Sequence, residues 1–554
     1  VKTYKQSKKQ CIKLCNMHKT RSAIYNRRLV KISMTEMNSG KGMKSKYRNI
    51  YDAVKESSYR FPEKTAIIEE EKSITYSELA EKIDIIAGWL KEEFKVKKGE
   101  RIGVLFVNSI DFYIVFYAIV KLGCIAVMVN TKMQSEEIEY VLKDTDTHCL
   151  VLNERWFAKV EKILPDINVD RILTDHVPET KIQGVRSFSI DEILKQKNKR
   201  SGSMYTSIQE DDLTAVILHT SVTTGKPKGI MVSHTNMMET AYGYQEALRV
   251  SEKDISVLSV PVFHILGLSC VSNMFLYMGG TIVVFEKFDS NKVLGAIEKY
   301  HATHFHSVPA VYIKMMHEAE RKYNLDSLRI AVCGGAVISN ENKEKFYRMA
   351  PKASFRIAYG LTETAGSGVL SYRHGDPGRE VMNCHITILN EDGSITEYGE
   401  GEALCEGSIV TTKVWGREDK DKEILHTGDI IRKEKNGDIF ILDRIKDVIN
   451  RGGEKLFPSL IEPVFLQYPG VEYASVFPVS DEILGEIPAA ILVEKENEKI
   501  NLEEIKKDLP GKIGKFELPQ YIEIWKEEDI PVTGNGKVRK KALRQIFEDK
   551  LKNN

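Results

Sequence analysis

The sequence predicts an α/β protein, with a large N-terminal body of parallel-type α/β layers and a small β segment, followed by a small, mobile α+β C-terminal domain. Two observations predict this class. From about residue 51, short β-rich runs alternate with amphipathic helical stretches, which is typical of parallel α/β layers. After Ser371, short strands separated by turn signals dominate, and a mixed tail follows. The length of 554 residues also favours more than one domain.

The body begins with a βαβ pattern. Residues 102–107 (IGVLFV) predict a strand, residues 111–122 a helix and residues 124–129 (CIAVMV) the next strand. Further strands are predicted at residues 215–218, 255–259, 281–285, 302–307 and 329–332. The apolar run at residues 112–120 is nine residues long, against the roughly 20 that a membrane-spanning helix needs, so it predicts a buried core helix.

The C-terminal third changes character. The turn signals at residues 390–393 (NEDG) and 435–437 (KNG) predict hairpins in a β segment that ends near Leu442. A compact α+β tail is then predicted from residues 457–468, 474–477, 489–493 and 502–509. The charged stretch before this tail is interpreted as a joint. The predicted domains are 1–48, a basic extension; 49–442, the N-terminal domain; 443–447, a hinge; and 448–554, the mobile C-terminal domain.

Composition excludes some classes of function. The 80 Lys and Arg residues balance 79 Asp and Glu residues, so the net charge of +1 provides no overall field that would attract nucleic acid or an anionic membrane. The eight Cys residues form no CxxC pair and no His-linked metal spacing, which disfavours a disulfide scaffold or structural zinc. We therefore expect a cytoplasmic protein with no transmembrane segment and no nucleic-acid partner.

The first 48 residues are unusual because they hold fourteen Lys or Arg residues and one acidic residue, Glu36. Three interpretations remain open: a transit peptide, a tail that binds nucleic acid or membrane, and a disordered extension or translated upstream sequence. We favour the extension, with a natural start at Met34, Met37 or Met43.

The most informative stretch is residues 218–229 (LHTSVTTGKPKG), which follows a predicted strand. Its backbone N–H groups and hydroxyls can bind phosphoryl oxygens, while the ammonium groups of Lys226 and Lys228 offset their charge. The stretch is not a Walker A motif, because Pro227 stands where that motif requires a hydroxyl residue.

Four further motifs follow in order: residues 358–363 (AYGLTE), 426–429 (HTGD), 442–447 (LDRIKD) with 452–454 (GGE), and 531–537 (PVTGNGK). Together with the loop they resemble the adenylate-forming superfamily of acyl-CoA synthetases, luciferases and peptide-synthetase adenylation domains. The resemblance extends from about residue 50 to 545. It implies that a carboxylic acid reacts with ATP to form acyl-AMP and pyrophosphate, and that the acyl group then passes to coenzyme A. The carboxylate itself attacks the α-phosphorus, so positioning and charge stabilisation supply most of the rate.

The resemblance also implies which residues contact the phosphates. The β and γ phosphates would be held by Thr220, Ser221, Thr223, Thr224, Gly225, Lys226 and Lys228. Glu363 would bind Mg²⁺, which prefers carboxylate, phosphate and water oxygens. Thr362 would contact the α-phosphate, and Lys537 would move in to neutralise charge on the carboxylate and the α-phosphate.

At the nucleoside end, the resemblance implies that Asp429 accepts both ribose hydroxyls and that Arg444 is a second ribose contact. The adenine slot would be formed by Gly334, Gly335, Ala336 and Tyr359, next to Gly360. For the thiol step, Lys446 would be the pivot of a domain rotation that brings Gly452, Gly453 and Glu454 to the nucleotide and leaves space for a pantetheine arm. His264 would lie at the acyl pocket, either as packing or as a gate.

The substrate is less closely specified. No Asp stands at residues 262–264 to pair with an ammonium group, and Phe263, Leu266, Leu268, Val308 and Val311 favour an apolar acid. A medium or long fatty acid is expected, and hence a role in fatty acid metabolism. The alternatives are an aryl acid, an acyl-AMP ligase that loads the pantetheine of a carrier protein, and a catalytically impaired homologue. Only Val222 suggests an impaired homologue, because it stands where the family usually has Gly in the phosphate loop. The oligomeric state is left open.

Overall fold

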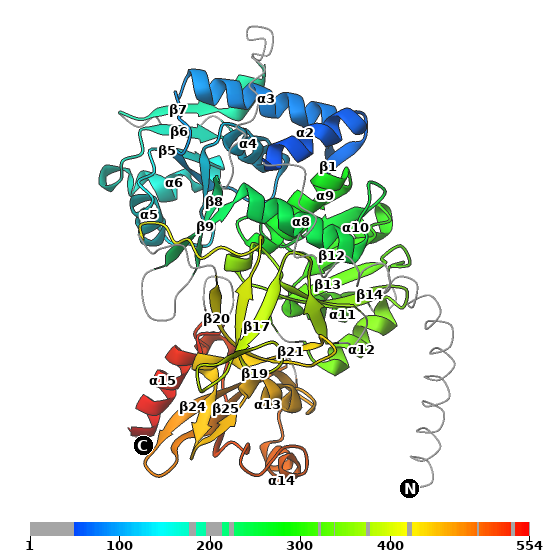
Figure 1. Ribbon diagram of the computed structural model, residues 1–554, viewed down its shortest axis with the longest axis vertical. Helices are drawn as coiled ribbons and strands as arrows, with labels where there is room; N and C mark the ends of the chain where they lie inside the picture. Colours follow the sequence, from blue (N-terminus) through cyan, green and yellow to red (C-terminus); the bar gives the residue numbers. More distant parts are fainter. Residues whose placement is uncertain are drawn as a thin grey trace. The chain divides into compact units, whose positions relative to one another are not determined.

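The structure is a computed structural model that describes residues 49–176, 184–195, 213–220, 227–319, 323–336, 338–372, 377–417, 424–495, 498–532 and 538–552 (Figure 1). The basic extension at residues 1–48 lies outside the described residues, as do residues 221–226 of the phosphate loop and Lys537.

The first sheet of the body is built around the predicted βαβ unit. Among the described residues its strand order is β7-β6-β5-β3-β4-β8-β9. The strands are β3 (Arg101–Leu105), β4 (Ile125–Met128), β5 (Cys149–Leu152), β6 (Arg171–Thr174), β7 (Arg186–Ser189), β8 (Thr214–Thr220) and β9 (Lys228–Ser233). Neighbouring strands are parallel except β8 and β9, which form an antiparallel pair. Lys228 therefore lies in a strand, and the loop expected to bind phosphates joins the two strands of a hairpin.

The second sheet contains the remaining predicted strands of the body. Its parallel part includes β10 (Ile255–Leu258), β11 (Thr281–Val284), β12 (His304–Ser307), β13 (Ile330–Gly334) and β14 (Ser354–Tyr359), together with β1 (Thr65–Glu69). The antiparallel strand β2 (Lys72–Thr75) closes one edge. The predicted strands of the body are thus present to within a few residues.

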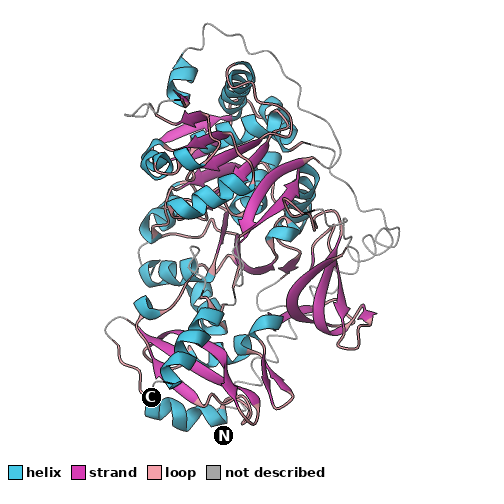
Figure 2. Ribbon diagram, turned by 90° about the vertical axis from the view of Figure 1, so that its left-hand side faces the viewer, coloured by secondary structure: helices cyan, strands magenta, loops and turns pink. Residues whose placement is uncertain are grey.

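Helices cover both faces of the parallel part of each sheet (Figure 2). The layer between the two sheets contains α2 (Ile50–Arg60), α3 (Tyr76–Glu92), α4 (Ile110–Lys121), α8 (His234–Leu248), the π-helix η5 (Leu266–Asn273) and α9 (Met274–Met278). The outer face of the first sheet packs against α5 (Ser135–Asp144) and α6 (Phe157–Glu161), and the outer face of the second against α10 (Ser290–Lys299), α11 (Pro309–Ala319) and α12 (Asn340–Met349). Alternate strand residues therefore enter different cores, as the period of two requires.

Helix α4 confirms the prediction of a core helix. Of its twelve residues only Asp111 is not buried, because apolar layers contact it from both sheets. Ser109 caps its start by accepting a hydrogen bond from Phe112 N. Among the described helices, none has the length and apolar character needed to cross a membrane.

The predicted β segment is present, and the structure shows that its strands continue the second sheet. Strand β15 (Val369–Ser371) returns antiparallel to β14 and is followed by β16 (Gly378–Glu380), β17 (His385–Leu389), β18 (Ile395–Thr396), β19 (Gly399–Glu406), β20 (Leu425–Lys433) and β21 (Ile439–Arg444). The turn at residues 390–393 joins β17 to β18, and the turn at residues 435–437 joins β20 to β21. In each, a glycine has φ near +85° (Gly393, 83°; Gly437, 86°), which glycine tolerates without strain.

The C-terminal domain is the predicted α+β unit. Its sheet contains β22 (Ile449–Arg451), β23 (Glu454–Leu456), β24 (Val471–Asp481), β25 (Gly485–Glu494) and β26 (Tyr521–Ile524). One face of the β24–β25 pair packs against α13 (Pro458–Phe465) and α14 (Leu502–Asp508), and the other against α15 (Lys540–Lys552). This domain therefore has apolar cores of its own.

Candidate functional site

The residues expected to contact the nucleoside lie where parallel strands end. In β12, β13 and β14, Ser307 is opposite Cys333 and Gly334 is opposite Ala358, so the carboxyl ends of the three strands are level. Ligands of open α/β sheets bind at such carboxyl ends. The chain leaves β13 through Gly334 and Gly335, and leaves β14 through Tyr359 and Gly360.

Backbone crowding explains the glycines at these strand ends. Gly335 has a φ of +83°, and a Cβ on Gly334 would lie 3.2 Å from the carbonyl oxygen of Ala358. At Gly360 a Cβ would lie 1.9 Å from the carbonyl oxygen of Gly366, so no side chain fits there. Ala336 is exposed beside this edge. The local backbone thus requires small residues, whether or not adenine binds against them.

Asp429 is the centre of a buried polar group. Its carboxylate is 4% exposed, and Arg444 Nε lies 2.8 Å from its Oδ1. The Tyr359 hydroxyl donates a hydrogen bond to its Oδ2 at 2.7 Å. Asp429 and Arg444 lie directly opposite each other in the β20–β21 ladder, so strand register fixes this pair. Burial and the neighbouring carboxylate hold the pKa of Tyr359 well above its usual value, so its hydroxyl remains a donor.

The backbone around Asp429 is fixed by its neighbours. Gly428 has a φ of +69° and donates its N–H to Glu402 Oε1 at 3.0 Å, while Thr427 Oγ1 accepts a hydrogen bond from Asp429 N at 3.1 Å. The Thr427 hydroxyl donates to the carbonyl oxygen of Ala403 at 2.8 Å. The HTGD motif is therefore a kinked strand segment that aims one carboxylate, and sequence analysis gave no signal for Glu402.

Glu363 lies in a single 3-10 turn, η6 (Thr362–Thr364), directly after β14. Burial raises the pKa of this carboxyl group, whereas the positive charges of Arg444 and Lys228 act in the opposite direction. Asp429 also raises its pKa, so these three charged groups lie within electrostatic range of Glu363. The structure thus brings two acidic and two basic residues together, each from a different one of four motifs that are separate in sequence.

This set of side chains fits a divalent cation bound together with phosphates. Mg²⁺ keeps several waters and takes one or two carboxylates plus phosphate oxygens, which matches the single carboxylate of Glu363 within electrostatic range of the ammonium group of Lys228. Among the described residues, no cluster of three or more His, Cys, Asp or Glu side chains could hold a metal ion by itself.

Of the expected acyl-pocket residues, Phe263 and His264 lie between β10 and η5, Leu266 and Leu268 lie in η5, Val308 follows β12, and Val311 lies in α11. The ring of His264 packs edge-on against that of Phe263, with centroids 4.8 Å apart, and its carbonyl oxygen accepts a hydrogen bond from Leu268 N at 3.0 Å. Phe263 and Leu268 are buried, and Val308 Cγ1 faces Gly335, 3.5 Å from where a Cβ would be. Of the apolar residues named from sequence, Val308 therefore borders the strand end at Gly335, Phe263 and Leu268 lie in the core between the sheets, and Val311 packs against the outer-face core.

The expected hinge is a single 3-10 turn, η7 (Ile445–Asp447), in which Lys446 is exposed. It joins β21, the last strand of the body, to β22 of the C-terminal domain. Gly452 (φ 60°) and Gly453 (φ 95°) form the turn between β22 and β23, where Gly452 N donates to the carbonyl oxygen of Leu484 at 2.8 Å. The structure does not bring these glycines into the polar group around Asp429.

Comparisons with known proteins agree with this architecture. A sequence model described as "AMP-binding enzyme" matches residues 54–415, and one described as "AMP-binding enzyme C-terminal domain" matches residues 460–537. The chain is 28% identical over 499 residues to a 2-succinylbenzoate–CoA ligase of Bacillus cereus, which covers 88% of this chain and 96% of the relative. It is 29% identical over 467 residues to the long-chain-fatty-acid–CoA ligase FadD13 of Mycobacterium tuberculosis, which covers 82% and 89%.

A solved structure is also similar. The o-succinylbenzoate coenzyme A synthetase (MenE) of Bacillus subtilis, in complex with ATP and a magnesium ion, matches with a TM-score of 0.76 and 25% identity, over 89% of this chain and 99% of that one. The prediction from the ordered motifs is confirmed, since the family model alone spans residues 54–415. The chain belongs to the AMP-binding enzyme family, that is, to the adenylate-forming enzymes that its motifs resemble.

Proposed function

We propose that the chain is an AMP-forming acid–thiol ligase: it activates a carboxylic acid with ATP to acyl-AMP, releases pyrophosphate, and transfers the acyl group to coenzyme A. The observation that carries the proposal is the convergence of Glu363, Lys228, Arg444 and Asp429 at the ends of β14 and β9 and on the β20–β21 pair. These residues match the groups that a nucleoside triphosphate needs: an acceptor for ribose, cations for phosphates, and a carboxylate for a metal ion.

Asp429 would bind the ribose. Each oxygen of an ionised carboxylate can accept two hydrogen bonds. Arg444 contacts Oδ1 and the Tyr359 hydroxyl donates to Oδ2, so the two residues orient the carboxylate. Arg444 and Tyr359 would thereby hold the carboxylate ionised and oriented, while the small residues Gly334, Gly335, Ala336 and Gly360 leave room for the base.

Lys228, with Thr220 and residues 221–226 of the loop, would bind the β and γ phosphates, and Glu363 would hold Mg²⁺. When bound, Mg²⁺ supplies charge neutralisation at the phosphate oxygens. Thr362 would contact the α-phosphate, where the substrate carboxylate attacks in line. Lys537 would stabilise the charge that develops there, so no residue of the protein needs to act as a nucleophile.

The thiol step would use a different arrangement of the C-terminal domain. Because two reactions share one nucleotide site, we propose that this domain rotates about Lys446 and presents Gly452 and Gly453 to the nucleotide. Two features support this: the connection is one exposed turn, and the C-terminal domain has its own cores.

We propose a medium or long fatty acid as the substrate, because Val308 faces Gly335 and the other residues named for the acyl pocket, among them Phe263 and Leu268, are apolar and buried. An aryl acid is the second candidate, favoured by the similarity to a 2-succinylbenzoate–CoA ligase over 88% of the chain. His264 would lie at the entrance of this pocket. We also propose a cytoplasmic enzyme, supported by the free, buried thiols of the six described cysteines.

A pyrophosphate-release assay tests the proposal. Purified chain is incubated with MgATP and either octanoate, palmitate, benzoate or 2-succinylbenzoate, with and without coenzyme A. We expect sustained release with a fatty acid and coenzyme A, and at most a single turnover without it. Sustained release without coenzyme A would overturn thiol transfer to coenzyme A, and faster release with the aryl acids would reverse the choice of substrate. Absence of release with every acid would indicate an impaired homologue.

A further inference from the structure

The segment at residues 411–415 runs beside β9 and links the two parts of the site that bind phosphate and metal in the proposed function. Thr411 N donates to the carbonyl oxygen of Glu363 at 2.7 Å, and the Thr411 hydroxyl donates to that of Met231 at 2.9 Å. Val414 bridges Ile230 in antiparallel fashion, and Trp415 N donates to the carbonyl oxygen of Gly229 at 2.8 Å. We call residues 411–415 the edge segment.

Helix α5 holds the far end of the edge segment. Trp415 Nε1 donates to the carbonyl oxygen of Asp144, the last residue of α5, at 2.8 Å. The Arg101 guanidinium lies over the same indole, 5.2 Å from its centroid. The indole therefore has one fixed orientation between the helix and β9.

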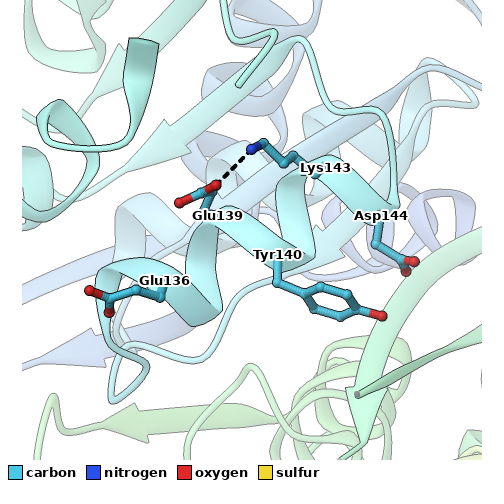
Figure 3. A pocket seen from close by; sticks show the side chains of 5 residues that line it. All are labelled: Glu136, Glu139, Tyr140, Lys143 and Asp144. Carbon is cyan, nitrogen blue, oxygen red and sulfur yellow. Dashed lines mark hydrogen bonds and ion pairs between the residues drawn. The ribbon is translucent and has the colours of Figure 1, made fainter. Parts of the chain in front are cut away.

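The same end of α5 contacts both strands of the hairpin that carries the phosphate loop. The Tyr140 hydroxyl donates to the carbonyl oxygen of Pro227 at 3.2 Å, and His219 Nε2 lies 3.2 Å from Asp144 Oδ2. His219 and Pro227 flank the loop at residues 221–226 on its two sides. Figure 3 shows Tyr140 and Asp144 pointing to one side of the helix, whereas Glu139 and Lys143 pair with each other; all four residues line a surface hollow, whose volume is about 540 Å³.

His219 and Gly229 of the β8–β9 hairpin allow the contacts with Asp144 and Trp415. The side chain of His219 is fully buried, and burial lowers its pKa, although Asp144 acts against this. The ring is therefore neutral at pH 7, and its Nε2–H donates to Asp144. A Cβ on Gly229 would lie 3.2 Å from His219 Nε2 and 3.3 Å from Trp415 Cβ, so a glycine at this position lets the histidine and the tryptophan pack on either side.

We propose that Trp415, Asp144 and His219 are positioning residues for the triphosphate of MgATP. The edge segment ties Glu363 to β9, and α5 ties the edge segment to both ends of the phosphate loop. Together, the edge segment and α5 fix the distance between Lys228 and Glu363, the residue proposed to hold Mg²⁺. The ribose group around Asp429 is held by other strands and does not depend on these contacts. This inference rests on the proposed function and adds the residues that set its affinity for the β and γ phosphates.

The test compares MgATP with AMP, which lacks the β and γ phosphates. Trp415→Phe keeps the ring and removes the donor to Asp144, and Asp144→Ala removes the partner of His219. Calorimetric titration is expected to show a Kd for MgATP raised about five-fold in each variant, as expected for one lost hydrogen bond, and an unchanged Kd for AMP. Under turnover, the KM for ATP rises while the KM values for the acid and coenzyme A do not change.

Trp525→Phe is the matched control, since this indole also donates one hydrogen bond, to Glu523 Oε2 at 2.8 Å, but lies in the C-terminal domain. It should leave both Kd values unchanged. Equal weakening of MgATP and AMP in Trp415→Phe, or no weakening of either, would overturn the inference. These outcomes are independent of the acid: a chain that binds both nucleotides but releases no pyrophosphate refutes the proposed function alone, and one that binds neither nucleotide refutes both.

Discussion

The polar group around Asp429 and the turn at Gly452–Gly453 differ in how the chain builds them. Asp429 is nearly completely buried, and its partners Arg444 and Tyr359 lie at the ends of strands of the same sheet. The glycine turn is exposed, has positive φ at both residues, and follows a single 3-10 turn that links two domains. The difference indicates that the polar group proposed to bind the nucleotide is preorganised. The groups proposed for the thiol step lie on the domain that we propose to rotate.

Lys537→Ala is expected to have the largest effect, because it should impair acyl-adenylate formation and spare thioester formation. We expect a loss of acyl-adenylate formation of about 100- to 1,000-fold, because one group that stabilises transition-state charge is removed. Thioester formation from supplied acyl-AMP should remain largely intact. The measurement is single-turnover kinetics of each half-reaction, and an equal loss in both would show that Lys537 serves both arrangements.

Asp429→Asn tests whether the buried group carries nucleotide affinity. The amide can donate as well as accept, and it leaves the charge of Arg444 without its partner, which is expected to weaken AMP binding by on the order of 2–3 kcal/mol. Titration with AMP measures this. The matched control is Asp438→Asn, which removes a carboxylate paired with Arg379 Nη2 at 2.9 Å in the same part of the sheet. Comparable weakening in both variants would mean that the effect is general destabilisation.

Acid should destabilise the body selectively. Burial lowers the pKa of His306 to about 3 and that of His234 to about 4, and the pKa of His304 is also depressed, while residues 448–554 contain no His. A group with a depressed folded-state pKa binds fewer protons when folded, so its stabilisation is lost as the pH falls below about 6.5. Between pH 7 and pH 5 we expect a loss on the order of 1–2 kcal/mol per histidine.

Calorimetric melting at pH 7 and pH 5 should therefore show the transition of the body moving to lower temperature relative to that of the C-terminal domain. Both transitions moving equally would contradict this reading of the comparison. His306→Phe, which removes one such group, should reduce the shift.

Val222→Gly should have the smallest effect. If the β-branched side chain restrains the phosphate loop, the KM for ATP falls and the KM for the acid is unchanged. The opposite outcome, an unchanged KM with a loss of about 0.5–1 kcal/mol in stability, would mean that Val222 has only a structural role. Steady-state kinetics with a melting curve decides between them, and normal turnover of the unmodified chain would remove the argument for an impaired homologue.

Much of this molecule could be predicted because local patterns and motifs agree. The run at residues 112–120 is apolar all round, so it could only be a helix buried between layers, as α4 is. The turns at Gly393 and Gly437 were predictable because a glycine after Asp or Asn is typical of turns, in which glycine adopts a positive φ without strain. The residues of the Asp429 group were named from motifs, but the 2.8 Å contact between Arg444 and Asp429 depends on strand register that periodicity does not specify.

Long-range contacts between polar residues were not predictable. Trp415 and Asp144 are 271 residues apart, and their contact is made through a backbone carbonyl, which leaves no mark on residue type. Glu402 receives the N–H of Gly428 through a pairing of β19 with β20 that many sequences could form. Sequence patterns specified which elements form, while the contacts that aim the side chains arise only when the sheets assemble.

Lys446→Pro tests the central claim most directly, because it alters the connection and leaves the nucleotide site intact. Proline fixes φ near −65° and obstructs the dihedral change that a domain rotation requires, whereas Lys446→Ala, the matched control, removes the charge and leaves the backbone able to move. The measurement is the rate of acyl-adenylate formation and the rate of thioester formation from supplied acyl-AMP, each in a single turnover. We expect Lys446→Pro to form the adenylate at the normal rate and to lose thioester formation by at least about ten-fold, with Lys446→Ala normal in both. Normal thioester formation by Lys446→Pro, or equal loss of both rates, would contradict the claim that the C-terminal domain rotates about Lys446 between two reactions at one preorganised site.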